Sequence, residues 1–109
     1  NWLHAQDTAD AIITIIESNV QNEIYNIAGG FEQPNVDTVR KVIMEYTENT
    51  DIFRFDLNKY VDLSYSRAGQ DVRYALNDDK LRNLGWKPKV KFDDVISSII
   101  KYYKQTFIW

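Results

Sequence analysis

Hydrophobic side chains recur every three or four residues in three long stretches of the chain, at 7–18, 34–46 and 92–103. Their apolar positions are Ala9, Ile12, Ile13 and Ile16, then Val36, Val39, Val42, Ile43 and Tyr46, then Phe92, Val95, Ile96, Ile99, Ile100 and Tyr103. Each pattern predicts an amphipathic helix. Asp7 stands where the first helix should begin, so we expect its carboxylate to cap the free N–H groups of the first turn.

Three shorter stretches alternate polar and apolar residues, which is the pattern of a strand. They cover residues 23–27, 60–65 and 72–76. The first runs into Ala28-Gly29-Gly30, where no nucleotide-binding glycine fingerprint continues, so a turn is predicted there.

A short helix ending at Leu84 is expected after the third of these stretches. Asn77 or Asp78 can cap its start, and Gly85 suits the left-handed position just beyond its end. Helices combined with a few short strands predict an α/β fold, without the full set of strands of a doubly wound sheet.

Composition is that of one folded domain spanning residues 1–109, with 44% hydrophobic and 14% aromatic residues. The formal charge of −3 and the scattered basic residues argue against a nucleic-acid partner. The lack of cysteine and the single histidine argue against disulfides and a metal site. No signal peptide or membrane-spanning apolar run is recognisable, so a cytoplasmic protein without membrane contact is expected.

The inventory of reactive side chains predicts no catalytic residue and no cofactor site. His4 lies beside apolar neighbours and is expected to be packed. The acidic pairs Asp78-Asp79 and Asp93-Asp94 stand at helix starts, where capping and the helix dipole explain them. By this inventory we expect the chain alone to be inert.

Binding chemistry is easier to place. Arg67 lies in a glycine-containing connector, where its guanidinium can fork onto a phosphate or make a surface ion pair, and the residues favour neither. For Arg73 the ion pair is the favoured interpretation. Asn35 can bond the edge of a base or cap its helix, and capping is favoured.

Several motifs together resemble the C-terminal part of the dTDP-glucose 4,6-dehydratase family. The motifs are residues 71–80 (DVRYALNDDK), Leu84-Gly85-Trp86-Lys87-Pro88 with Phe92, residues 1–7 (NWLHAQD) with Ala9 and Ala11, residues 25–29 (YNIAG), and residues 35–39 (NVDTV). Leu-Gly-Trp-x-Pro before an amphipathic helix is shared by extended short-chain dehydrogenases/reductases that act on nucleotide sugars. The segment 67–80 favours the dehydratase branch over epimerases and decarboxylases.

The resemblance implies a fold and a reaction. In these enzymes an N-terminal Rossmann domain holds NAD and supplies a Tyr-x-x-x-Lys pair. A hydride leaves C4 of the sugar, water is lost across C5 and C6, and the hydride returns to C6. The smaller C-terminal domain grips the nucleotide and its diphosphate. The chain, which reads as cut from a longer protein, is therefore expected to be a substrate-binding domain without its Rossmann partner.

The family's binding positions fall on three residues. By resemblance, Arg67 contacts the diphosphate, Gln70 lies near it at a position that is usually histidine, and Asn35 contacts the base or its neighbouring loop. The family's Arg-Pro-Gly-His-Asp is here Arg67-Ala68-Gly69-Gln70-Asp71. Loss of the proline loosens the loop, and glutamine cannot carry a positive charge.

These departures leave open which nucleoside-diphosphate sugar is bound. A piece of a UDP-sugar epimerase or decarboxylase remains an alternative, as does a non-catalytic nucleotide-binding or self-associating module. A homo-oligomer is therefore among the expected assemblies.

Overall fold

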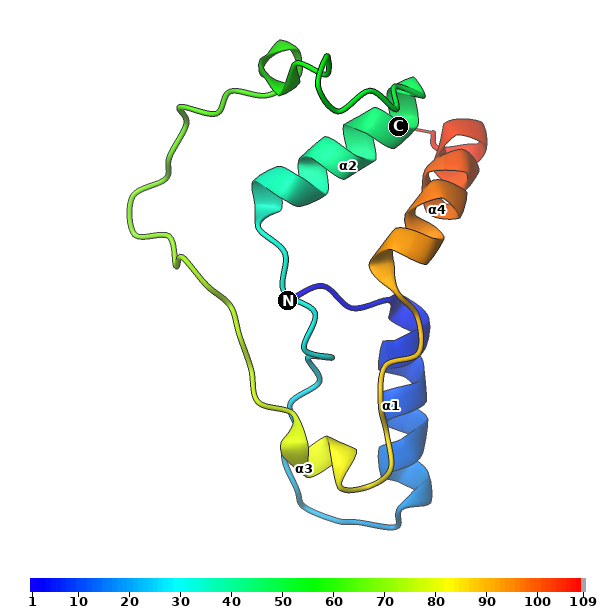
Figure 1. Ribbon diagram of the computed structural model, residues 1–109. Helices are drawn as coiled ribbons and strands as arrows, with labels where there is room; N and C mark the ends of the chain where they lie inside the picture. The colour runs from blue at the N-terminus through cyan, green and yellow to red at the C-terminus, as the bar shows by residue number, and fades with distance from the viewer. Residues whose placement is uncertain (109) are drawn as a thin grey trace. The chain divides into compact units, whose positions relative to one another are not determined.

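Residues 1–108 are described by a computed structural model, and their regular structure is helical (Figure 1). The elements are α1 (Ala5–Glu17), α2 (Asn35–Thr47), the 3₁₀ turn η1 (Leu57–Lys59), α3 (Asp79–Arg82) and α4 (Phe92–Thr106). The three long helices confirm the predictions from hydrophobic periodicity. The short helix expected from its cap and stop residues is present as α3, but it ends at Arg82 and not at Leu84. Within residues 1–108, no helix has the combined length and apolar character needed to cross a bilayer.

The strand part of the α/β prediction is wrong for the described residues, because 23–27, 60–65 and 72–76 form no strand. A strand needs a ladder of backbone hydrogen bonds to a neighbour. The first and third segments line one pocket, and a side chain links the first to the residue just after the third: Asn26 Nδ2 donates to the Asn77 carbonyl at 3.1 Å. Alternation therefore marked segments that lie together without supplying the ladder.

The apolar stripe of α1 faces solvent, contrary to what its periodicity suggests. Ala9, Ile12, Ile13 and Ile16 are all exposed, Ile16 to 72% of its surface. The opposite face is buried, and it presents Asp7 and Ala11 to the protein interior. A polar residue thus faces inward because it has specific partners there, while the larger hydrophobic side chains stay outside.

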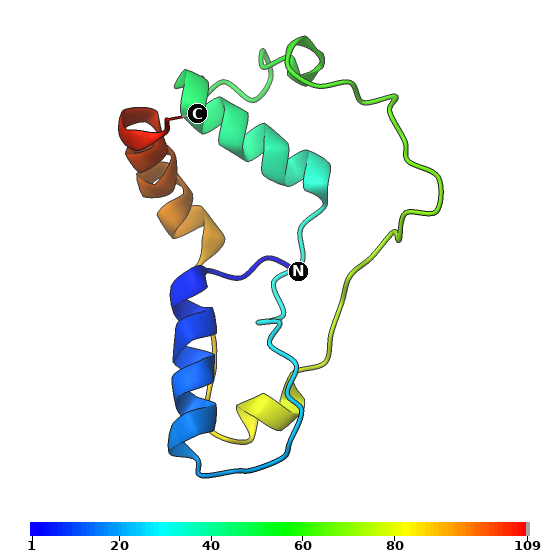
Figure 2. The same cartoon turned by 180° about the vertical axis from the view of Figure 1, so that it is seen from behind.

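Asp7 does not cap α1, which corrects the prediction made for it. The helix begins two residues earlier, and the N-cap is His4, whose Nδ1 accepts the backbone N–H of Gln6 at 3.1 Å. The carboxylate of Asp7, only 1% exposed, instead accepts the backbone N–H groups of Lys89 and Val90 at 2.9 and 3.0 Å. These bonds bind the segment after Trp86 along α1, as both views show (Figures 1 and 2).

The first of two compact units comprises residues 1–33 and 73–94. Its core is small: Ala11, Leu81 and Trp86 are buried, and five partly buried side chains surround them, namely Leu3, Ile15, Tyr25, Ile27 and Leu84. The indole Nε1 of Trp86 donates to the Asp7 carbonyl at 3.0 Å. Gly85, at φ +98°, ends the α3 region in the predicted left-handed conformation.

The second unit comprises residues 34–72 and the chain from 95 onward. It holds α2, η1 and most of α4. Lys104 of α4 lies 4.8 Å from the centre of the Tyr46 ring on α2, and its Nζ is 3.9 Å from a Glu48 carboxylate oxygen. A cation–π contact of this kind at a partly exposed site contributes roughly 0.5–1 kcal/mol.

Candidate functional site

The predicted phosphate contact, Arg67, lies in an exposed turn. The backbone N–H of Gln70 donates to the Arg67 carbonyl at 3.4 Å, and Gly69 at φ +72° supplies the left-handed residue that the turn requires. Every residue from 62 to 77 is exposed. The Arg67 guanidinium makes no ion pair or hydrogen bond within residues 1–108, so its donors are available to a ligand.

Asn35 lies elsewhere in the same unit, as the first residue of α2 after Pro34. Its side chain is exposed and makes no capping hydrogen bond at this helix start, so the capping interpretation is wrong. The structure brings Arg67 and Gln70 into one turn. In the described part of the chain, no hydrogen bond joins Asn35 to either of them.

Arg73 forms an ion pair with a carboxylate, as expected from the sequence. Its Nε and Nη2 donate to the two oxygens of Glu32 at 2.8 and 2.7 Å. This bidentate bond lowers the pKa of Glu32 and raises that of Arg73. Both side chains are well exposed, so the pair orients the chain more than it stabilises it.

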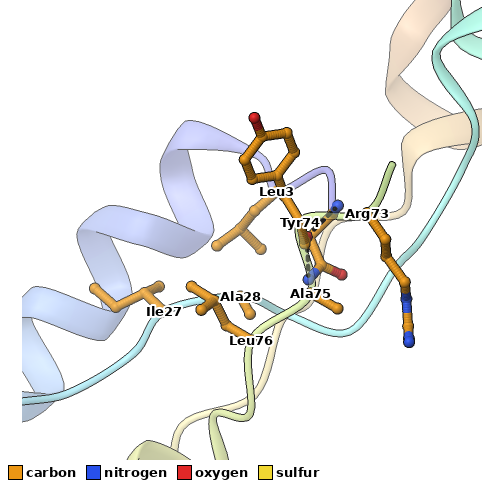
Figure 3. Close-up of a pocket in the computed structure, with 8 residues that line it drawn as sticks. Leu3, Ile27, Ala28, Arg73, Tyr74, Ala75 and Leu76 are labelled. Carbon is orange, nitrogen blue, oxygen red and sulfur yellow. Dashed lines mark hydrogen bonds between the residues drawn. The ribbon is translucent and has the colours of Figure 1, made fainter. Parts of the chain in front are cut away.

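A pocket of about 400 Å³ opens in the first unit (Figure 3). It is lined by Asn1, Leu3, Ile27, Ala28, Arg73, Tyr74, Ala75 and Leu76. The apolar side chains of Leu3, Ile27 and Leu76 gather on one side, and the long side chains of Arg73 and Tyr74 point away from them. The sequence analysis missed this pocket because its walls come from three separate segments. The one sequence feature that could have indicated it is that two of these segments alternate polar and apolar residues.

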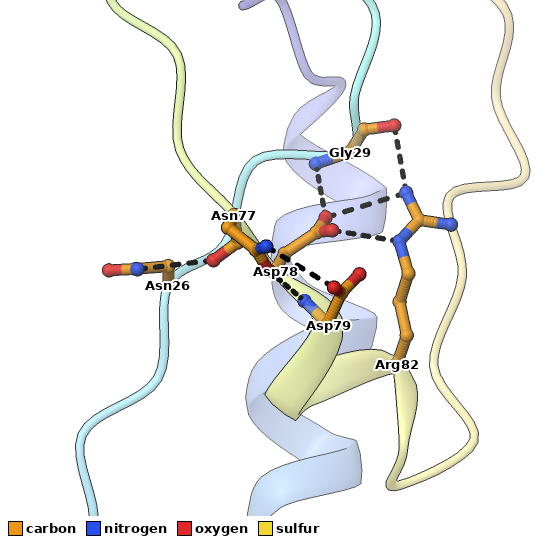
Figure 4. A network of polar contacts seen from close by, with 6 residues as sticks. All are labelled: Asn26, Gly29, Asn77, Asp78, Asp79 and Arg82. Atoms are coloured by element: carbon orange, nitrogen blue, oxygen red, sulfur yellow. Dashed lines mark hydrogen bonds and ion pairs between the residues drawn. The ribbon is translucent and has the colours of Figure 1, made fainter.

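A polar network fixes the end of the segment that carries Arg73 (Figure 4). Arg82 Nε donates to Asp78 Oδ1 at 2.8 Å, and its Nη2 donates to the Gly29 carbonyl at 3.0 Å. The backbone N–H of Gly29 donates in turn to Asp78 Oδ2 at 2.8 Å. The Arg82 hydrogen bond is the main reason that the pKa of Asp78 lies below its usual value.

Asn77 completes the network. Its Oδ1 accepts the backbone N–H of Asp79, the first residue of α3, at 2.8 Å, so of the two predicted caps Asn77 supplies the side-chain bond, although the N-cap position itself is Asp78. Asp78 makes no side-chain bond to the start of that helix because its carboxylate is already engaged. Both buried acids of the first unit, Asp7 and Asp78, therefore act as acceptors that join distant segments.

The glycine-rich turn at Gly29 does not fit a dinucleotide. Its N–H, the group that would face a pyrophosphate, is bonded to Asp78. A Cβ added at Gly29 would lie 2.7 Å from Leu3 Cδ1, so a side chain already fills the adjacent space. The turn is therefore occupied by contacts within the protein.

Comparison with known proteins identifies the relatives of the chain. The sequence profile of the family described as GDP-mannose 4,6 dehydratase matches residues 1–99. A human protein named dTDP-D-glucose 4,6-dehydratase is 31% identical over 98% of the chain, and an Escherichia coli dTDP-glucose 4,6-dehydratase is 32% identical over all of it. The low-salt glycan biosynthesis protein Agl12 of Haloferax volcanii is 28% identical over 94% of the chain.

In each case the match spans only 30% of the relative's length. The chain has no significant match among solved structures. The profile nevertheless covers nearly the whole sequence. The chain therefore belongs to the GDP-mannose 4,6-dehydratase family of nucleotide-sugar dehydratases.

Proposed function

We propose that this chain is the C-terminal, nucleotide-sugar-binding part of a nucleotide-sugar 4,6-dehydratase, and that Arg67 binds the diphosphate of the substrate. The main support is that Arg67 lies exposed on a glycine-containing turn and that its guanidinium makes no ion pair within residues 1–108, in a member of this family. An arginine fork matches the geometry of phosphate oxygens. In this proposal Gln70, on the same turn, adds a neutral hydrogen bond.

The nucleoside of the proposed substrate is thymidine. Two relatives whose names specify dTDP-glucose match the chain at 31% and 32% identity, which supports this choice. Asn35 is the candidate for a contact with the base, since its amide is exposed and makes no capping bond. UDP and GDP are the competing ligands, and the experiment below separates them.

The chemistry of the dehydratase belongs, in this proposal, to a Rossmann part of a longer enzyme that holds NAD. The side chains here support that division of labour. His4 Nδ1 accepts a backbone N–H, and the Asp7 carboxylate accepts two. With these groups engaged in holding the backbone, we expect the 109 residues alone to bind substrate without converting it.

The test is isothermal titration calorimetry of the chain with dTDP, UDP, GDP and thymidine. We expect weak binding of dTDP, with a Kd near the millimolar range, and no heat with thymidine, which lacks the diphosphate. Arg67→Ala should abolish the dTDP heat. The matched control is Arg54→Ala, which removes an equal charge from an exposed arginine of the same unit.

Two outcomes would overturn the assignment. If Arg54→Ala weakened binding as much as Arg67→Ala, the attraction would come from overall charge and not from the Arg67 turn. If none of the diphosphates gave heat at millimolar concentration, the chain would not carry the binding function by itself.

A further inference from the structure

The N-cap of α1 is a histidine, and its capping bond depends on the charge of the ring. His4 has extended backbone torsions (φ −70°, ψ 142°), and its Nδ1 accepts the backbone N–H of Gln6 at 3.1 Å. Asparagine, aspartate, serine and threonine are the usual residues at this position, and their oxygens accept a hydrogen bond at neutral and mildly acidic pH alike. An imidazole accepts only while it is neutral, because both ring nitrogens of the protonated form are donors.

Protonation of His4 would therefore act on the start of α1 in two ways. The ring would lose its acceptor, so that the Gln6 N–H would face a second donor. It would also place a positive charge at the positive end of the helix dipole, where a cation is disfavoured. Histidine is the side chain that ordinarily changes charge between pH 5 and 8, so both effects fall within this range.

The charged groups beside His4 are already engaged. Asp7, the acid of the first turn, accepts two backbone N–H groups from the segment before α4. Glu32 is held by Arg73 in a bidentate bond, and the N-terminal ammonium donates to the Tyr74 carbonyl at 3.2 Å. None of these groups is therefore available to stabilise a protonated ring.

The segments next to this end of α1 also lack a partner for a protonated His4. The start of α4 carries the exposed acids Asp93 and Asp94, and the contact between the Phe92 and Trp2 rings joins it to the N-terminal segment. Within residues 1–108, no carboxylate forms an ion pair with His4. The segment held by the Asp7 carboxylate carries three exposed lysines whose charges oppose a further proton, namely Lys87, Lys89 and Lys91.

We propose that His4 is a pH-sensitive cap, which holds the first turn of α1 while its ring is neutral and releases that turn when the ring is protonated. The same turn carries Asp7, so release also loosens the anchor of the segment before α4. Since the cap favours the neutral ring, the unfolded chain binds more protons than the folded one. The stabilisation is thus present at high pH and is lost as the pH falls. The Arg67 turn, which lies in the second unit, takes no part in it.

Urea unfolding at pH 7.5 and 5.5 tests the cap, and the chain has no other histidine. On going to pH 5.5, the unfolding equilibrium constant of the unaltered chain should rise about fivefold more than that of His4→Asn, which keeps a cap at both pH values. His4→Ala should unfold about fivefold more readily than the unaltered chain at pH 7.5 and should show the pH dependence of His4→Asn. Equal pH dependence of the unaltered chain and His4→Asn, or full stability of His4→Ala at pH 7.5, would overturn the proposal.

Proton NMR supplies the local measurement. In ¹⁵N-labelled protein the Gln6 amide should shift between pH 7.5 and 5.5 along the same titration curve as the His4 ring protons. The matched control is the Asn58 amide, which donates to the Asp56 carboxylate at the start of η1, also at 3.1 Å. It should not move in this range, because a carboxylate cap keeps its charge there. A Gln6 amide that does not follow the ring, or an equal shift at Asn58, would contradict the proposal.

Discussion

Replacing Asp7 by alanine tests whether a buried acid, and not a hydrophobic contact, binds the segment after Trp86 to α1. The carboxylate is 1% exposed and accepts the backbone N–H groups of Lys89 and Val90 at 2.9 and 3.0 Å. Alanine would leave both donors without an acceptor. A buried donor without a partner costs about 1–3 kcal/mol.

The expected magnitude follows from the surroundings of these bonds. Both are only partly buried, so water can reach the freed donors and each loss falls near 1–1.5 kcal/mol. Alanine regains about 0.5 kcal/mol through its higher helix propensity. The net loss in the free energy of unfolding at Asp7→Ala should be about 2 kcal/mol, or a fall in Tm of about 10 °C.

Thermal unfolding followed by circular dichroism measures this loss. The matched control is Asp10→Ala on the same helix, whose carboxylate, among the residues up to 108, accepts only the exposed Gln6 amide at 3.1 Å. It should change the unfolding free energy by less than about 0.5 kcal/mol. Equal stability of the Asp7→Ala and Asp10→Ala variants would refute the role assigned to Asp7.

Three further predictions concern the first unit. Because the pKa of Asp78 is lowered in the folded state, its ionised carboxylate stabilises the fold at pH values above its unfolded pKa near 4. In urea titrations between about pH 5 and 2, the free energy of unfolding should therefore fall more steeply with falling pH in the unaltered chain than in Asp78→Asn. Parallel plots of unfolding free energy against pH for the two proteins would contradict this. Leu81→Ala should cost about 2–5 kcal/mol in chemical denaturation, whereas Ile16→Ala, at a 72% exposed side chain, should stay within about 0.5 kcal/mol. The reverse order would show that the hydrophobic stripe of α1 is the buried face. Gly29→Ala places a Cβ 2.7 Å from Leu3 at φ +77° and should lower Tm by several degrees, whereas an unchanged Tm would show that Leu3 moves freely.

The helices were predictable from the sequence because their signals are local. Spacing located α2 and α4, and Gly85 marked the end of the α3 region through a backbone conformation that glycine adopts readily. The ion pair of Arg73 was also expected, although its partner Glu32 lies 41 residues away and no local pattern names it. The start of α3 was predicted at Asn77 or Asp78, and it lies there because a helix start depends only on neighbouring residues: Asp78 is the N-cap, and Asn77 Oδ1 accepts the backbone N–H of Asp79.

What the sequence did not predict depends on distant partners. Asp7 was predicted to cap its own helix, but its carboxylate accepts the backbone N–H groups of Lys89 and Val90, which lie more than eighty residues further along the chain. The hydrophobic spacing of α1 gave the helix but the wrong face, since Ala11 and Asp7 fit against Trp86 while the isoleucines stay outside. The strand predictions failed because alternation cannot guarantee a hydrogen-bonding neighbour.

The central claim, that the Arg67 turn binds the diphosphate of a nucleotide sugar, is tested most directly by amide chemical shifts. In ¹⁵N-labelled protein titrated with dTDP, the account predicts that the largest shifts occur at Arg67, Gly69 and Gln70, and that thymidine leaves these amides unmoved. Shifts centred on the pocket around Leu3 and Leu76, or shifts of equal size with thymidine and dTDP, would contradict it.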